Sequence, residues 1–408
     1  MTTLSQCRVN RILAGSVIGV VPLALTAYKS LVPILIALLA CVAAVQWRSR
    51  PTGSRMPWSV RMVALTWSGY ALAMLALVSW HGLYFAEWDN PSRFLIVALL
   101  LIGLAWGQPS ARAFVVSCCA AQAGMLLLSV SAVYSGAPRA GLTTNPIQLG
   151  TISMLWGLAA LPWCREPSMG RLCRGLAGLA CGTAVVVAGL SGTRGVFFAL
   201  GVCIMAATTW VVRRAWCRRA KPIGITLVIV AAVTMVAALY WLANDTGMIA
   251  RSIVELRSIA DGNFNTSVGL RILMWRAAWA EFLSHPWLGG GDFSTALTEQ
   301  MRQIDWPQSQ APFTHAHSDW LQMLATCGLV GLVVLAAVLI TPAVAALRVS
   351  RDYSSLPPAA AALLLSLLFF AVSMTTQTVF AHQNGSLGYA LLIGALSVML
   401  PISPPDTE

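Results

Sequence analysis

Charged residues are scarce in this sequence of 408 residues: they make up 10% of the positions, against 58% for hydrophobic residues. Soluble globular domains carry about 25% charged residues, so this shortage excludes a soluble domain and indicates an integral membrane protein. The hydrophobic residues form continuous runs and do not alternate with polar ones. Continuous runs of about 18 residues or more cross a hydrocarbon core of about 30 Å as helices, whereas the strands of a β-barrel would alternate.

Sites built from paired cysteines or clustered carboxylates are also missing from the sequence. The ten cysteines include no C-x-x-C pair, and none lies in the long polar stretch between positions 244 and 313. We therefore expect neither a disulfide framework nor a thiolate metal site. The acids contain no D-x-D pair, whereas two-metal catalysis needs clustered carboxylates. The sequence thus predicts no metal and no cofactor.

The hydrophobic runs predict an all-α membrane protein with about twelve transmembrane helices. The predicted spans lie near Ile12–Ala27, Leu31–Gln46, Val60–Trp80, Phe94–Trp106, Phe114–Tyr134, Ile147–Trp163, Leu176–Leu190, Val196–Val212, Ile223–Leu242, Trp320–Leu347, Ala359–Phe380 and Ser386–Ile402. We expect residues 1–242 to hold the first nine helices and residues 315–408 the last three. Residues 243–314 would form one large external insertion that contains helices of its own.

Basic residues outnumber acidic ones, with a net charge of +12, and they gather in alternate connections between the spans. These connections contain Arg48, Arg50, Arg55, Arg61, Arg165, Arg171, Arg174, Arg213, Arg214, Arg218, Arg219, Lys221, Arg348 and Arg351. The positive-inside rule therefore places both termini in the cytoplasm and the stretch after Leu242 outside. Topology and attraction to anionic membrane lipid explain the excess charge, so no nucleic-acid partner is expected. The first run has no recognisable cleavage site, and we expect it to be a retained span.

Arg194 lies in a short hairpin, Leu190 to Val196, between two predicted spans. An arginine near the middle of a membrane is costly to insert and tends to be functional. The glycines on both sides of Arg194 let the backbone turn tightly and leave room for a ligand. The alternative is an arginine that only reaches the lipid headgroups from a helix end.

Arg271 and Arg276 lie in a segment with helical periodicity inside the polar stretch. Arg271 and Trp275 are one helical turn apart and share a face, whereas Arg276 points elsewhere. An amphipathic helix on the membrane surface, with its arginines at lipid phosphates, is the alternative interpretation. That alternative fits Arg276 better than Arg271, whose neighbours are hydrophobic.

His315 and His317 precede the tenth predicted span, at the boundary between external water and membrane. Histidine titrates near neutral pH and is suited to act as a general base. A zinc site is a weaker hypothesis, because Asp319 is the only nearby carboxylate and no His-x-x-x-His spacing occurs. The segment also has the pattern of a helix start, with Thr314 or Ser318 as the N-cap and Asp319 in the first turn.

These segments follow one another in a specific order. They are Ser191-Gly192-Thr193-Arg194-Gly195, Arg271 with Trp275, the turn from His285-Pro286 through Gly289 and Gly291, His317-Ser318-Asp319-Trp320-Leu321-Gln322, and Gly328-Leu329-Val330-Gly331. In order and spacing they resemble the superfamily of O-antigen ligases and O-antigen polymerases, over roughly Leu190 to Leu347. Ser318 is a departure, because relatives often have asparagine after the histidine.

The resemblance implies a metal-independent membrane glycosyltransferase with a fold like that of the GT-C transferases. It implies an undecaprenyl diphosphate-linked glycan as donor and a site on the periplasmic side of the bacterial inner membrane. Arg194 and Arg271 would bind the diphosphate, with a smaller contribution from Arg276, because arginine offers paired, permanently charged donors to such oxygens. His317 would take the proton of the acceptor hydroxyl, with His315 as its orienting partner or substitute.

Three functions fit this resemblance or the composition. A ligase, favoured by the single external insertion, transfers the finished glycan to the lipid A-core oligosaccharide. A polymerase instead extends a second carrier-linked glycan. A polyprenyl-glycan transporter is a different class, in which Arg194 and Arg271 would bind an anionic substrate in transit; the missing internal repeat counts against it.

Overall fold

The computed structural model describes residues 2–50, 53–82, 89–217, 233, 248–292, 294–302, 315–351, 353 and 355–401. Within those ranges the chain is helical and contains no strand. The helices are α1 (Thr2–Ala27), α2 (Leu31–Arg48), α3 (Trp58–Trp80), α4 (Asp89–Leu104), α5 (Ala111–Tyr134), α6 (Pro146–Ala160), α7 (Gly170–Ser191), α8 (Arg194–Cys217), α10 (Met248–Ala260), α11 (Ser267–Ser284), α12 (Ser294–Arg302), α13 (Asp319–Arg351), α14 (Pro358–Ser373) and α15 (Gln383–Val398). Short 3₁₀ turns, Leu161–Arg165 and Pro167–Met169, connect α6 to α7.

The helical content and the length of the helices confirm the prediction of an all-α membrane protein. Eight described helices are long and apolar enough to cross a membrane. They are Cys7–Ala27, Leu31–Arg48, Trp58–Trp80, Ala111–Tyr134, Pro146–Arg165, Pro167–Ser191, Arg194–Arg213 and Asp319–Arg351. The ninth predicted span, Ile223–Leu242, lies outside the described residues except for position 233. The orientation of the chain in the membrane stays a prediction.

Two compact units are defined by the contacts within the chain. The first comprises Met1–Thr193, Leu329–Leu367 and Val379–Glu408, and the second comprises Arg194–Gly328 and Leu368–Thr378. The predicted division at residues 242 and 314 follows membrane topology instead of contacts, and it stays a prediction.

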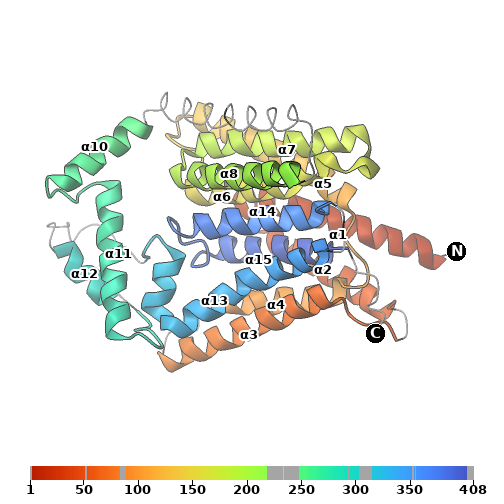
Figure 1. Cartoon of the computed structure of the whole chain (residues 1–408), viewed down its shortest axis with the longest axis horizontal. Helices are drawn as coiled ribbons and strands as arrows, with labels where there is room; N and C mark the ends of the chain where they lie inside the picture. The colour runs from red at the N-terminus through yellow and green to blue at the C-terminus, as the bar shows by residue number, and fades with distance from the viewer. Residues whose placement is uncertain are drawn as a thin grey trace. The chain divides into compact units, whose positions relative to one another are not determined.

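The first unit is a bundle in which α1 packs on α5, α7 packs on α5 and α6, and α4 packs on α2, α3 and α15 (Figure 1). Its interior is aromatic: the rings of Trp67, Phe94 and Tyr389 lie within 6.2 Å of one another, centroid to centroid. Trp156 is fully buried, and its indole nitrogen donates to the carbonyl of Ile18 over 2.9 Å. This buried polar group is thus paired across helices, from α6 to α1, as a membrane interior favours.

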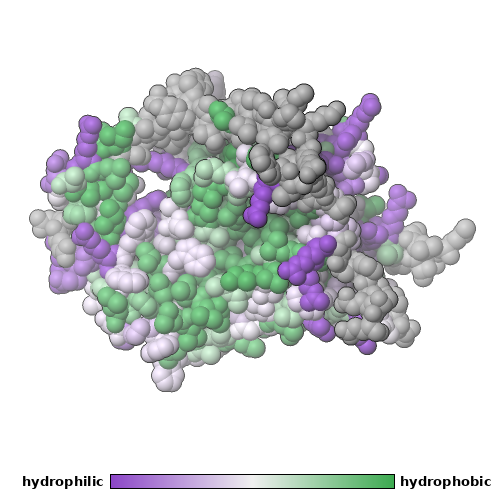
Figure 2. Space-filling view, in the orientation of Figure 1, coloured by the Kyte–Doolittle hydropathy of each residue, from purple (hydrophilic) through white to green (hydrophobic). Residues whose placement is uncertain are grey.

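The second unit contains α8, the helices α10 to α12, the first turns of α13 and the end of α14. In it α11 packs against α10 and against α12 (Figure 1). Figure 2 shows hydrophilic side chains over α10 to α12, at the left of the view. This unit has a small apolar core of its own, formed by Leu273, Met274, Ala277, Ala278, Leu297, Met301, Ala316 and Ala325.

The predicted span Ala359–Phe380 is too long at its C-terminal end, because α14 ends at Ser373. Residues 374–377 follow α14 as a turn, and carbonyl groups of this turn accept hydrogen bonds from outside α14. Met374 and Gln377 accept hydrogen bonds from the amide of Asp319, over 2.9 and 3.2 Å. The residues from Thr375 to Thr378 are polar, and the tertiary hydrogen bonds of this turn follow the end of the helix.

Candidate functional site

The predicted hairpin before Arg194 is a tight turn between α7 and α8. Gly192 has φ 62° and ψ 30°, the left-handed conformation that ends α7. The side chain of Arg139 closes the turn, since its guanidinium donates to the carbonyls of Ser191 and Gly192 over 2.8 and 3.2 Å. A cation at the C-terminal carbonyls of a helix is favourable for hydrogen bonding and for the helix dipole. The turn thereby places Arg194 as the first residue of α8.

Arg194 is paired with a carboxylate that the sequence did not single out. Nη2 of Arg194 lies 3.2 Å from Oε1 of Glu255, on α10. The other carboxylate oxygen of Glu255 accepts the backbone amide of Val268 over 3.1 Å. Val268 lies in the first turn of α11, where amide groups have no partner within the helix. Glu255 therefore bridges two elements that favour anions: a guanidinium and a helix N-terminus.

The helix α11 carries Arg271, Trp275 and Arg276, as predicted, and Thr266 caps its N-terminus by accepting the amide of Gly269 over 3.0 Å. On a helical wheel, Arg271 and Arg276 lie at opposite edges of the buried stripe. Arg271 is half-buried, whereas Arg276 is exposed and stacks over the ring of Phe264, 5.2 Å from guanidinium carbon to centroid. Arg271 and Arg276 therefore lie in different surroundings.

The predicted turn after α11 packs against a break in α13. Gly328 has φ 61° and ψ −157°, which interrupts α13. The carbonyls of Ala325 and Thr326, close to this break, accept the amides of Gly290 and Gly291 over 2.9 and 3.1 Å. A Cβ atom on Gly289 would lie 2.3 Å from the backbone atoms of Thr326 and Cys327, so only glycine fits there. Hydrogen bonds and close packing therefore hold the turn against the break in α13.

The histidine segment is anchored on both sides of His317. Ala316 is fully buried in the small core, and its amide donates to Oε1 of Gln322 over 2.8 Å. Ser318 and Asp319 are each 3% exposed. Between these anchors His317 has φ 50°, a left-handed conformation that is uncommon outside glycine. The rings of His315 and His317 belong to half-buried residues that flank the buried Ala316.

The helix-start pattern in this segment is confirmed by Ser318 and Asp319. The helix α13 begins at Asp319, and Oγ of Ser318 accepts the amide of Leu321 over 3.5 Å. Asp319 is the acidic residue of the first turn. Thr314, the other predicted cap, lies outside the described residues.

The turn formed by Thr376 and Gln377 connects the histidine segment to the start of α8. A Cβ atom on Gly195 would lie 2.7 Å from Oγ1 of Thr376 and 2.9 Å from Nε2 of Gln377. The carbonyl of Gln377 also accepts the amide of Asp319 over 3.2 Å. Gly195 is therefore needed for close packing next to Arg194. Thr376 and Gln377 were not predicted as site residues; their polar pair within a hydrophobic run was the available signal.

Hydrogen bonds and packing contacts thus join three predicted segments within the second unit. Glu255 links Arg194 to α11, and the Thr376–Gln377 turn links Gly195 to Asp319. Ala316 packs in the core that α11 forms. Among the residues that the structure describes, no group of three or more His, Cys, Asp or Glu side chains is placed to hold a metal ion. The roles of His317, His315, Arg194, Arg271 and Arg276 stay predictions.

The fold and this polar segment define the class of the protein: an all-α membrane protein whose predicted site residues, Arg194, Arg271, Arg276, His315 and His317, lie in one helical unit. Residues 179–336 match the protein family described as O-Antigen ligase. Over this stretch the chain is therefore similar to O-antigen ligases. A comparison with curated proteins returned no match.

Proposed function

We propose that the protein is a glycosyltransferase of the bacterial inner membrane that transfers O-antigen glycan from undecaprenyl diphosphate to the lipid A-core oligosaccharide. The observation that supports this most directly is the match of residues 179–336 with the O-Antigen ligase family. That stretch contains Arg194, Arg271 and His317, together with Glu255, which pairs with Arg194. The active site would face the periplasm.

Arg194 and Arg271 would bind the diphosphate of the donor. Negative charge grows on this leaving group as the anomeric C–O bond breaks, and guanidinium groups offer paired donors to its oxygens. The carboxylate of Glu255 occupies one edge of Arg194. Binding of a diphosphate would then replace one anion by another at Arg194, and the N-terminal amides of α11 would remain favourable for anions. Arg276 would contribute less, because Phe264 holds it at the other edge of α11.

His317 would act as the general base. The acceptor hydroxyl oxygen forms a bond to the anomeric carbon, the bond from that carbon to the diphosphate oxygen breaks, and the hydroxyl proton moves to the imidazole. Undecaprenyl diphosphate leaves. The support for His317 over His315 is its left-handed backbone, because strained residues concentrate at functional sites. Both neighbours of His317, Ala316 and Ser318, are buried, which supports a fixed backbone at this position.

Purified protein, supplied with carrier-linked glycan and lipid A-core, tests the proposal. We expect the glycan on the core oligosaccharide, with equal rates in the presence and absence of a chelator. Transfer to a second carrier-linked glycan would instead make the protein a polymerase. Movement of carrier lipid across a bilayer without either product would favour the transporter and reject the proposal.

A further inference from the structure

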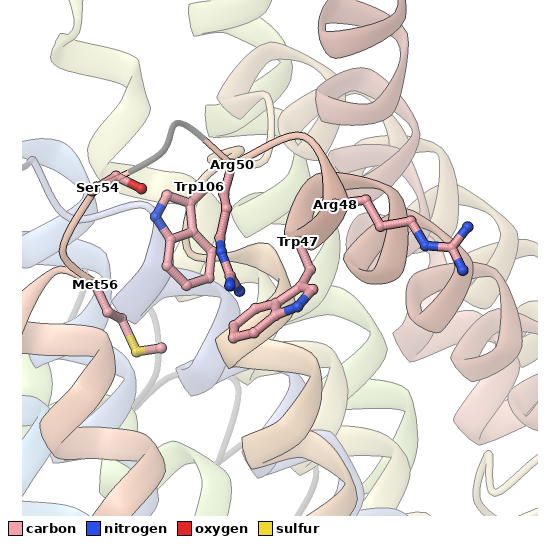
Figure 3. A pocket seen from close by; sticks show the side chains of 7 residues that line it. Trp47, Arg48, Arg50, Ser54, Met56 and Trp106 are labelled. Atoms are coloured by element: carbon pink, nitrogen blue, oxygen red, sulfur yellow. The ribbon is translucent and has the colours of Figure 1, made fainter.

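A pocket of about 640 Å³ lies in the first unit, far along the sequence from the residues discussed above. It is formed by the end of α2, the connection to α3 and the residues that follow α4, and its lining is Trp47, Arg48, Arg50, Gly53, Ser54, Met56 and Trp106. Figure 3 shows the guanidinium of Arg50 between the two indole rings. The proposed transferase chemistry uses none of these residues.

Two tryptophans hold the guanidinium of Arg50 in place. Its central carbon lies 3.9 Å from the ring centroid of Trp47 and 5.8 Å from that of Trp106. The two rings meet edge to face, with their centroids 5.1 Å apart and their planes at 78°. Stacking uses the face of a guanidinium and leaves its N–H donors available at the edge. Arg50 is therefore oriented by aromatic contacts that do not neutralise its charge.

The positive charge at this pocket has no acidic counterpart nearby. Within the described part of the chain, no carboxylate lies within 4.0 Å of Arg48 or Arg50. The indole nitrogen of Trp106 is buried and has no hydrogen-bond partner among those same residues. The preoriented guanidinium of Arg50, whose edge donors remain available, favours an anion with several acceptor oxygens, such as a phosphate group.

The surroundings of the pocket favour a phosphate that is attached to a lipid. The outer face of α2 is hydrophobic and exposed, with Leu31, Ile34 and Leu38 each at least 39% exposed. Tryptophan and arginine at the end of such a helix mark the headgroup level of a membrane. A second pair of this kind lies in the same unit, where Arg348 stacks over Trp58 at 4.5 Å. We propose that the pocket binds the phosphate headgroup of an anionic phospholipid.

Ligand-dependent thermal unfolding of the full-length protein in detergent tests this proposal. Short-chain phosphatidylglycerol, phosphatidylcholine and inorganic phosphate are titrated separately, and the unfolding midpoint gives the affinity for each. We expect phosphatidylglycerol to stabilise the protein more than the other two. Arg50→Ala should weaken this binding about tenfold, because it removes charge-assisted donors. Arg50→Lys keeps a cation over the ring but loses the fork, so it should still fold and should bind less tightly than the wild type.

Arg61→Ala is the matched control. Arg61 is an exposed basic residue near the start of α3, and it does not line the pocket. It should keep the phosphatidylglycerol response of the wild type, which excludes a simple effect of net charge. An equal loss in Arg61→Ala and Arg50→Ala would overturn the proposal. So would equal stabilisation by phosphatidylcholine, or by inorganic phosphate, since the latter would identify a site for free anions.

Discussion

At the scale of single residues, His317 makes the strongest case for a chemical role, because its backbone is left-handed and both of its neighbours are buried. Asparagine tolerates this conformation, so His317→Asn removes the imidazole without adding strain. We expect its turnover at saturating donor to fall about 10²–10⁴-fold, as for loss of a general base. The unfolding temperature should stay close to that of the wild type.

His315→Ala is the companion variant, measured with and without added zinc, and its turnover should fall less. Unchanged turnover in His317→Asn would remove His317 as the base. Activity that depends on zinc would revive a metal-ligand role for the two histidines.

The proposed binding of the diphosphate by Arg194 and Arg271 can be tested through the shape of the side chain as well as its charge. Arg194→Ala and Arg271→Ala should each lower transfer by about 10²-fold or more, because each removes donors to a developing negative charge. Lysine at either position keeps the charge but loses the paired donors, so it should restore little activity. Arg276→Ala is the control from the same helix, and its effect should be small. Near-normal rates in both Arg194→Ala and Arg271→Ala would mean that they contact only lipid headgroups.

Glu255 has a different role from the arginine with which it pairs. The side chains of Arg194 and Glu255 are 39% and 16% exposed, so their ion pair contributes little to stability, about 0–1 kcal/mol. Glu255→Gln keeps an acceptor for the amide of Val268 but removes the anion that competes with the donor at Arg194. We therefore expect a lower KM for the donor with little change in the unfolding temperature.

Glu299→Gln breaks an exposed ion pair with Arg302 and serves as the control. A raised KM in Glu255→Gln would show instead that Glu255 holds Arg194 in its productive position.

At the scale of elements, the break in α13 at Gly328 determines how the turn after α11 is held. The φ and ψ of Gly328 fall in a region that only glycine populates. A Cβ atom there would also lie 2.5 Å from the carbonyl carbon of Trp287. Gly328→Ala should therefore destabilise the protein by roughly 3 kcal/mol, measured as a lower unfolding temperature. Activity should fall as well, because the turn and the start of α13 are held together.

Gly182→Ala is the control within α7, where nothing lies within 4 Å of the added methyl group. Alanine there should be neutral or stabilising. Equal effects of the two substitutions would mean that the break in α13 is not needed for the fold.

The sequence predicted elements better than the contacts between them. Hydrophobic runs located the described apolar helices but not α10 or α12, and Ser318 and Asp319 predicted the start of α13. The break at Gly328 was not predicted, because a glycine inside a hydrophobic run has the same pattern in a straight helix and in a broken one. Glu255, Thr376 and Gln377 were missed for a related reason: their importance comes from partners that are distant in sequence.

At the scale of the whole molecule, composition was sufficient to predict an all-α membrane protein, since a chain with so few charges cannot expose its hydrophobic residues to water. The match of residues 179–336 agrees with the resemblance seen in the motifs between Leu190 and Leu347. Whether the protein acts as a ligase or as a polymerase depends on which acceptor enters the site. No local pattern of residues specifies that choice.

Membrane orientation is the prediction on which the location of the site depends. The basic connections should lie in the cytoplasm and the segment around Asn263 in the periplasm. Asn263 and Arg55 are both exposed and suit single-cysteine labelling, in a background where the exposed Cys7 and Cys41 are replaced by serine. In spheroplasts, which lack the outer membrane but keep the inner membrane intact, an impermeant thiol reagent should label Asn263→Cys and not Arg55→Cys. Both should react after lysis. If Asn263→Cys reacted only after lysis, the site would face the cytoplasm, and periplasmic transfer of a carrier-linked glycan would be rejected.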